Sequence, residues 1–240
     1  MAKQVAFFTR VMYNIIQIEK DTKVSEGDTM QDKPKVLILS GSPHADGTTA
    51  RALTEVKASL ESEEIEVELI QVGHLVVPGC KGCYACGKLK KCVIDDVVNE
   101  LAAKLYEADG VVIGSPVFYA SPNGAFLALL DRLFYSSRFD KSMKVGASVV
   151  AARRGGCTAS FDVLNKYFTI SGMPVVSSTY WNQVHGSNKD DAECDIEGMQ
   201  TMRMLGKNMA FLIKSIRLGK EAFGTPEREK KIYTNFIRHD

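Results

Sequence analysis

The sequence predicts a doubly wound α/β fold, in which five parallel strands form one sheet that helices cover on both faces. Two observations predict it. From residue 35 onward, short apolar runs alternate with longer segments whose apolar residues recur at helical spacing, which is typical of a parallel sheet with crossover helices. In addition, three of the apolar runs are followed by loops of unusual composition, and folds of this kind bind ligands at the carboxyl ends of their strands.

The first half of the predicted domain contains three strands. Val36–Leu39 is a short apolar run of the kind found in buried strands. Helical spacing of apolar residues predicts a helix over Thr49–Ser62, and partial alternation predicts a strand over Ile65–Val72. After a cysteine-rich segment we expect a helix near Asp95–Glu107, which begins with aspartates suited to capping it. The apolar run Gly110–Gly114 is then the third strand.

The second half repeats the alternation. Ser121–Phe134 carries five large apolar residues at helical spacing and is the next expected helix. Strands are expected over Val145–Ala151 and Pro174–Ser178, with a helix over Ala159–Ile170 between them. A last helix is expected to cover much of Asp190–Ile216.

The length of 240 residues fits one domain with an extension. We expect residues 1–33 to form that extension, mostly as an amphipathic helix followed by a linker, and residues 34–240 to form the α/β domain. The net charge of +1 and the lack of a long basic block argue against nucleic acid and membranes as partners. The longest apolar runs are too short to span a membrane, and Met1–Lys20 does not resemble a secretory signal. We therefore expect a soluble, cytoplasmic protein.

The segment Ser40–Thr49 is the most informative loop. It follows the first strand, precedes a helix and is rich in small and hydroxyl residues, so its amides lie where a helix N-terminus favours phosphate. Neither a P-loop nor a dinucleotide-binding pattern is present. The simpler alternative is an ordinary turn in which Thr48 or Thr49 caps the helix.

Three segments together resemble the flavodoxin-like NAD(P)H-dependent FMN reductase superfamily over about Lys35–Gly186. They are Gly41-Ser42-Pro43-x-x-x-Gly47-Thr48-Thr49, Gly114-Ser115-Pro116-Val117-Phe118-Tyr119-x-Ser121-Pro122-Asn123-Gly124 and Asp131-Arg132-Leu133-Phe134. The resemblance implies a flavodoxin-like sheet of order 2-1-3-4-5. It also implies an oxidoreductase that passes electrons from NAD(P)H through bound FMN to a small acceptor such as a flavin or quinone, or to an electron-carrier protein. Assembly as a homodimer or homotetramer is implied as well.

The resemblance also implies the FMN site, in which the flavin N5 carries the chemistry and no catalytic side chain is needed. The phosphate would be held by Ser42, His44, Gly47, Thr48 and Thr49, where His44 replaces the arginine common in the family. The ring and ribityl chain would contact Ser115, Pro116, Val117, Phe118, Tyr119 and Ser121. A third wall would come from Arg153, Arg154, Gly155 and Gly156. The alternatives are that Phe118 and Tyr119 belong to the core at the strand end, and that the arginines are simply solvated.

Four of the six cysteines form the compact pattern Cys80-x2-Cys83-x2-Cys86-x5-Cys92. The spacing resembles that of the iron–sulfur flavoproteins, a branch of the same superfamily, in which it would bind a [4Fe–4S] cluster. Three interpretations stay open: such a cluster exchanging single electrons with FMN, a metal-free loop, or a structural zinc site. Three functions also stay open: an FMN-dependent NAD(P)H oxidoreductase, an electron-transfer iron–sulfur flavoprotein that carries the cluster, or a non-catalytic redox sensor that binds FMN or a metal.

Overall fold

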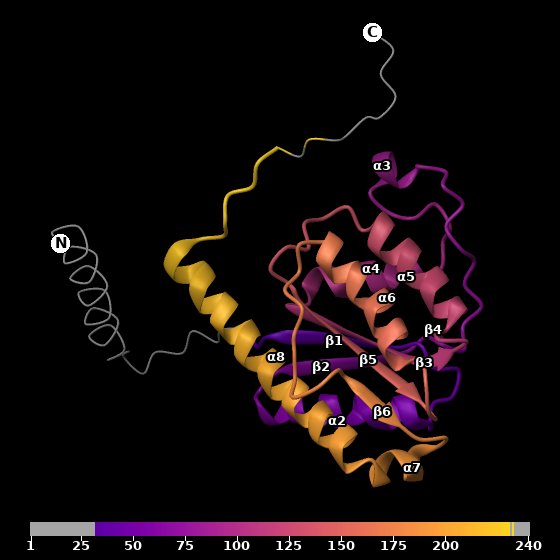
Figure 1. Cartoon of the computed structure of the whole chain (residues 1–240). Coiled ribbons are helices and arrows are strands. Elements are labelled where there is room, and N and C mark those ends of the chain that lie inside the picture. The colour runs from indigo at the N-terminus through magenta and orange to yellow at the C-terminus, as the bar shows by residue number, and fades with distance from the viewer. Residues whose placement is uncertain (1–31, 231, 233–240) are drawn as a thin grey trace, which may run out of the picture. The chain divides into compact units, whose positions relative to one another are not determined.

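The computed structural model describes residues 32–230 and residue 232. Residues 1–31 of the expected extension lie outside this part. Within it, parallel strands alternate with helices, and the sheet lies between two helical layers (Figure 1). The elements are β1 Lys35–Ser40, α2 Thr48–Ser62, β2 Glu66–Gln71, α3 Cys86–Leu89, α4 Val97–Glu107, β3 Gly110–Phe118, β4 Ser121–Pro122, α5 Gly124–Ser136, β5 Val145–Ala152, α6 Cys157–Ile170, β6 Gln183–His185, α7 Lys189–Cys194 and α8 Ile196–Phe223.

The sheet order is β2-β1-β3-β5-β6, with every neighbouring pair parallel, and the short β4 pairs antiparallel with the end of β3. Without β4 this is the predicted order 2-1-3-4-5, so the fold class is confirmed. The chain reverses its direction of strand addition between β1 and β3. In open parallel sheets, ligands bind in the crevice at that point, outside the carboxyl ends of the strands.

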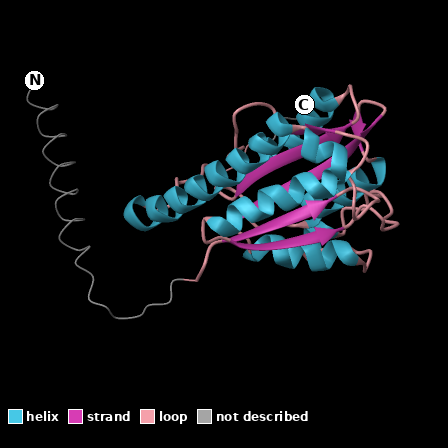
Figure 2. Cartoon of the chain, turned by 90° about the horizontal axis from the view of Figure 1, so that it is seen from below, coloured by secondary structure: helices cyan, strands magenta, loops and turns pink. Residues whose placement is uncertain are grey.

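Each face of the sheet has its own apolar core, because successive side chains of a strand point to opposite faces. In β1, Val36 and Ile38 pack toward α2 and α8, whereas Leu37 and Leu39 pack toward α4, α5 and α6. Figure 2 shows the strands from below, with helices on both sides of them. Strands buried on both faces are continuous apolar runs, which is why β1, β3 and β5 could be predicted from composition.

The predicted strand Pro174–Ser178 is wrong. In the structure Val175 forms an isolated bridge with Gly146, and the fifth parallel strand is β6, which pairs with the end of β5. The chain approaches the sheet at Val175, leaves it and returns at Gln183.

Asn182 explains the return. Its side chain is buried, its Nδ2 donates to the carbonyl oxygen of Ser148 over 3.0 Å, and its own carbonyl oxygen accepts from the amide of Val150 over 3.0 Å. The Ser178 hydroxyl donates to Asn182 Oδ1 over 2.6 Å. Asn182 thus provides hydrogen-bond partners for two backbone groups of β5 at the edge of the sheet. Because these contacts are polar, hydrophobic periodicity does not predict them.

The predicted last helix does cover much of Asp190–Ile216, as α8, but the residues just before it form a separate short helix, α7, and the two helices meet at Asp195. The Asp195 carboxylate accepts from the amide of Gly198 over 2.9 Å, which caps α8, and from the amide of His185 over 2.7 Å. This cap ends one helix and fixes the start of the next against β6. Among the described residues, none of the helices is long and apolar enough to cross a membrane.

Candidate functional site

The N-terminus of α2 lies at the carboxyl end of β1 and is open to an anion. Gly47 is the N-cap residue with an extended backbone, and no side chain of the described residues caps the helix or places an acid in its first turn. The first amides of a helix lack partners within it, so those of α2 are available to a ligand. The alternative that Thr48 or Thr49 caps this helix is therefore wrong.

The residues expected to bind phosphate surround this helix end in different ways. Ser42, Thr48 and Thr49 are largely buried, whereas His44 is exposed. The Thr48 hydroxyl lies 3.0 Å from the carbonyl oxygens of Gly186 and Asn188, to which it donates. The Thr48 hydroxyl thus links the segment after β6 to the start of α2. To bind a phosphate, the hydroxyl would have to break these hydrogen bonds.

Asn123 ties the loop after β1 to the loop after β3. Its Nδ2 donates to the carbonyl oxygen of Gly41 over 2.8 Å, and its Oδ1 accepts from the amide of Ala125, which caps α5. The amide of Asn123 in turn donates to the buried Ser115 hydroxyl over 2.9 Å. The two loops expected to hold the phosphate and the flavin ring are therefore fixed relative to each other by one buried side chain.

The loop after β3 is a tight hairpin into β4. Phe118 pairs with Ser121, and the two residues between them, Tyr119 and Ala120, both have positive φ, at 52° and 56°. A two-residue hairpin turn of type I′ demands this backbone, which costs free energy for residues other than glycine. The hairpin exposes 45% of Phe118 and all of Tyr119. The alternative that these aromatic residues are strand-end core is wrong, and both are accessible to a flat ligand.

Gly156 brings the loop after β5 against this hairpin. Its φ is 95°, and a Cβ there would lie 2.9 Å from Ala120 Cα and 2.9 Å from Val117 Cγ1. Arg153, Arg154 and Gly155 are exposed beside it. The structure thus brings the three loops expected to surround FMN to one edge of the sheet, and only a glycine allows the second and third to touch.

Replacing Gly156 by alanine is expected to lower the free energy of unfolding by about 1–3 kcal/mol, because the substitution adds both positive-φ strain and a clash with Ala120. Thermal and urea unfolding measure it. Gly155→Ala is the matched control, since a Cβ at Gly155 meets no atom within 4 Å, and should change stability by no more than about 0.5 kcal/mol. Equal stabilities of the two variants would contradict the close approach.

The four clustered cysteines line one cavity of about 130 Å³. Roughly 10–15 Å³ suffices for one water, so the cavity has room for a larger body. Its remaining lining comes from the same segment and from Arg132, Tyr135 and Ser136 of α5. Cys86 is buried, Cys92 is half-buried, and Cys80 and Cys83 are exposed. All four cysteines thus border the same cavity, with different degrees of exposure.

As placed, these thiols do not fit a single metal ion. Among residues 32–230 and 232, no three His, Cys, Asp or Glu side chains are arranged to hold one ion, whereas zinc needs its thiolates at about 2.3 Å. A [4Fe–4S] cluster takes one thiolate on each of four irons, so its ligands surround a body instead of meeting at a point. The four thiols that border the cavity are the kind of ligand that such a cluster uses.

Arg132 is the residue of this region whose function sequence reasoning missed, although it lies in a family-like motif. It is 1% exposed and forms a two-pronged ion pair with Asp96, at 2.6 and 2.9 Å. Desolvation alone would raise the pKa of Asp96, but hydrogen bonds from Arg132 and from the amide of Val98 hold it below its ordinary value. Only an arginine at an otherwise apolar position of the α5 pattern hinted at this role.

The flavin loops and the cysteine cavity share α5. Asn123 caps the helix at the flavin loops, and Arg132 reaches the cysteine cavity nine residues later. At about 1.5 Å per residue the two positions are about 13 Å apart along the helix axis. The two candidate sites are therefore distinct but rigidly connected.

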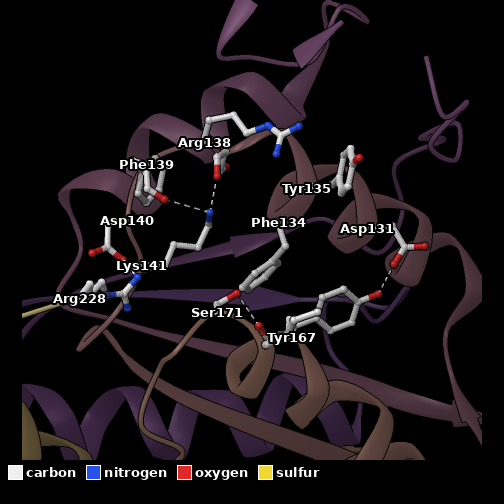
Figure 3. A pocket seen from close by; sticks show the side chains of 12 residues that line it. Asp131, Phe134, Tyr135, Arg138, Phe139, Asp140, Lys141, Tyr167, Ser171 and Arg228 are labelled. Carbon is white, nitrogen blue, oxygen red and sulfur yellow. Dashed lines mark hydrogen bonds and ion pairs between the residues drawn. The ribbon is translucent and has the colours of Figure 1, made fainter. Parts of the chain in front are cut away.

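A larger cavity of about 610 Å³ lies at the C-terminal ends of α5 and α6 (Figure 3). Burial lowers the pKa of its Lys141 to about 8, and the ammonium donates to the carbonyl oxygen of Ser137, the C-cap residue of α5. On the facing wall the Tyr167 hydroxyl donates to Asp131 over 2.5 Å. The loops expected to bind FMN contribute nothing to this cavity, and the buried lysine is accounted for as a cap of α5.

Cys157, which begins α6 beside the flavin loops, differs from the clustered thiols. Burial, together with the negative charge of Asp195, raises its pKa to about 11. A thiol of this kind is neutral and unreactive near pH 7, so Cys157 serves as a packing residue.

Comparisons with known proteins agree with these observations. A sequence profile described as NADPH-dependent FMN reductase matches residues 34–187. An iron–sulfur flavoprotein of Methanocaldococcus jannaschii is 33% identical over 195 residues, which are 76% of this chain and 99% of that protein. An iron–sulfur flavoprotein of Methanosarcina thermophila is 28% identical over 191 residues, or 78% of this chain and 99% of that protein.

Solved structures share the fold at low sequence identity. The crystal structure of RosB with bound 8-demethyl-8-formylriboflavin-5′-phosphate has a TM-score of 0.60 and 16% identity, covering 86% of this chain and 95% of its own. An archaeal flavodoxin has a TM-score of 0.51 and 16% identity, covering 75% of this chain and 99% of its own. These similarities confirm the flavodoxin-like fold.

Proposed function

Because the chain belongs to the NADPH-dependent FMN reductase family, a family of flavin-dependent oxidoreductases, we propose that it transfers electrons between an FMN at the carboxyl edge of its sheet and a [4Fe–4S] cluster on Cys80, Cys83, Cys86 and Cys92. The observation that carries the proposal is that all four cysteines line one cavity. The relatives named iron–sulfur flavoproteins support it. When bound, FMN supplies two-electron and one-electron chemistry and the cluster supplies one-electron transfer.

The residues around the flavin edge would bind and orient FMN. The open amides of α2 would bind the phosphate, and the exposed aromatic side chains of Phe118 and Tyr119 would contact the ring. The exposed Arg153 and Arg154 would place positive charge where the reduced ring becomes anionic. We infer no catalytic side chain, because these groups position the flavin and do not react.

The residues around the cysteine cavity would hold the cluster and balance its charge. Four thiolate ligands make a cluster site negative, and Lys81, Lys88, Lys90 and Lys91 are all exposed on the same segment. Free thiols for such a site persist in a reducing compartment, which fits a cytoplasmic location. The partner that exchanges electrons with this site is proposed to be an electron-carrier protein.

Composition analysis of the full chain, purified without oxygen, tests the proposal. We expect one FMN, about four irons and about four acid-labile sulfides per chain, and a brown solution. A protein that contains FMN but no iron after anaerobic reconstitution would contradict the proposed cluster. Iron without FMN would remove the flavin site.

A second candidate function is direct oxidation of NAD(P)H by the bound flavin, with a flavin or quinone as acceptor. It is favoured by the family profile, whose description names NADPH. Anaerobic mixing with NADPH distinguishes the two: bleaching of the flavin band within seconds supports direct nicotinamide use. Bleaching only with a reduced electron carrier supports the first function alone.

A further inference from the structure

The guanidinium of Arg132 lies beneath the cysteine segment and contacts both of its ends. Its NH1 donates to the carbonyl oxygen of Pro78 over 3.3 Å, and its NH2 donates to that of Ile94 over 3.3 Å. Pro78 comes two residues before Cys80, and Ile94 comes two residues after Cys92. One planar group therefore closes the loop that carries all four thiols.

The same guanidinium is anchored from the other side. Its ion pair with Asp96 joins it to the first turn of α4, because the Asp96 carboxylate also caps that helix at the amide of Val98. A buried ion pair adds little net stability compared with an apolar side chain of similar size. An apolar residue at this position could not form the hydrogen bonds that Arg132 donates to the two ends of the cysteine segment.

Arginine N–H groups also reach the sulfur atoms. Arg132 NH2 lies 3.2 Å from Cys92 Sγ, and NH2 of Arg138, in the loop that follows α5, lies 3.7 Å from Cys86 Sγ. Asn99 of α4 grips the backbone of Cys92, since its Oδ1 accepts from the Cys92 amide over 3.0 Å and its Nδ2 lies 3.2 Å from the Cys92 carbonyl oxygen. Cys92 is thus fixed at both its backbone and its side chain.

We propose that Arg132 is a positioning residue that holds the two ends of the cysteine segment together before any iron binds, and that Arg132 and Arg138 donate hydrogen bonds to the sulfurs of Cys92 and Cys86. The first half concerns the chain alone, and the second rests on the cluster of the proposed function. Hydrogen bonds to ligand sulfurs stabilise the more negative, reduced form of an iron–sulfur cluster. The two arginines therefore raise its reduction potential.

Hydrogen exchange of the iron-free full chain tests the closure. Arg132→Gln is expected to raise exchange at least tenfold at the hydrogen-bonded amides of the segment, those of residues 87–90 and Cys92, while the sheet keeps its protection. Arg217→Gln is the matched control, because it removes another two-pronged pair, Arg217 with Asp109 at 3.0 and 2.7 Å, far from the cysteines. If Arg132→Gln does not fold, Arg132→Lys gives the same comparison, since one ammonium keeps the charge but cannot reach both ends of the loop. Unchanged exchange at the amides of residues 87–90 and Cys92 overturns the closure.

The reduction potential of the loaded protein tests the sulfur contacts. Arg138 is exposed and its replacement should not disturb folding. Arg138→Gln is expected to lower the ratio of reduced to oxidised cluster about tenfold at a fixed potential, which is about 59 mV for one electron, and Arg138→Lys should recover part of the loss by restoring the charge. An unchanged potential in Arg138→Gln overturns this half. A wild-type chain that binds no iron would refute the cluster of the proposed function. It would not affect the test of the closure, which uses the iron-free chain.

Discussion

Cys92→Ser is expected to abolish the iron and sulfide content of the protein while FMN remains bound at its wild-type stoichiometry. Cys92 lines the cavity with the other three thiols and is the one held on its backbone by Asn99 and at its sulfur by Arg132. A serine hydroxyl keeps nearly the same size but is a far poorer ligand for iron than a soft thiolate. The flavin loops contact none of these atoms, so the flavin spectrum should persist.

Iron, sulfide and FMN analysis of the reconstituted variant measures this outcome. Cys194→Ser is the matched control, because Cys194 is an exposed thiol at the end of α7 and does not line the cavity. It should retain full iron and full FMN. A Cys92→Ser protein that keeps its iron would show that the cluster lies elsewhere or that this thiol is not a ligand.

Gly47→Asp is expected to weaken FMN binding by roughly 30- to 1000-fold, or about 2–4 kcal/mol, through charge repulsion at partly screened range. Gly47 is the N-cap of α2 and has an extended backbone that aspartate adopts readily. A Cβ there meets only the Cβ of His44, at an ordinary 3.6 Å. The new carboxylate would accept from the open amides of the first turn and thus occupy the place of the phosphate.

The same substitution should leave the apoprotein slightly more stable, by a few tenths of a kcal/mol, because aspartate caps a helix better than glycine and favours its positive end. Gly47→Asn separates charge from shape: it caps the helix without a negative charge and should cost FMN affinity much less than Gly47→Asp. Fluorescence titration with FMN and thermal unfolding measure the two effects. Equal FMN affinity of Gly47→Asp and wild type would place the phosphate away from α2.

The central part of the fold could be predicted from sequence because its strands are buried on both faces. β1, β3 and β5 are apolar throughout, and α2, α4 and α6 follow the helical spacing to within about two residues. The edge of the sheet could not be predicted in this way. β6 is three residues long, and it is placed by the hydrogen bonds of Asn182 and the cap of Asp195, which are specific polar contacts between distant residues.

The same division applies to the candidate sites. The compact spacing of the cysteines indicated one shared location, and all four line the same cavity. Their closure by Arg132 could not be predicted, because it depends on α5 packing beside the end of the loop. Likewise, the small residues of the loop after β1 indicated a helix N-terminus open to an anion. The exposure of Tyr119 depends on a strained hairpin for which its sequence, Tyr-Ala, gives no signal.

The central claim is that one chain carries both FMN and a four-thiolate iron–sulfur cluster, and an anaerobic reductive titration tests it most directly. The absorption of the flavin and the electron paramagnetic resonance signal of the reduced cluster are followed as reductant is added. The account predicts uptake of about three electrons per chain, two by FMN and one by the cluster, falling to about two in Cys92→Ser. Uptake of two electrons by the wild-type protein, all of them at the flavin, would contradict it.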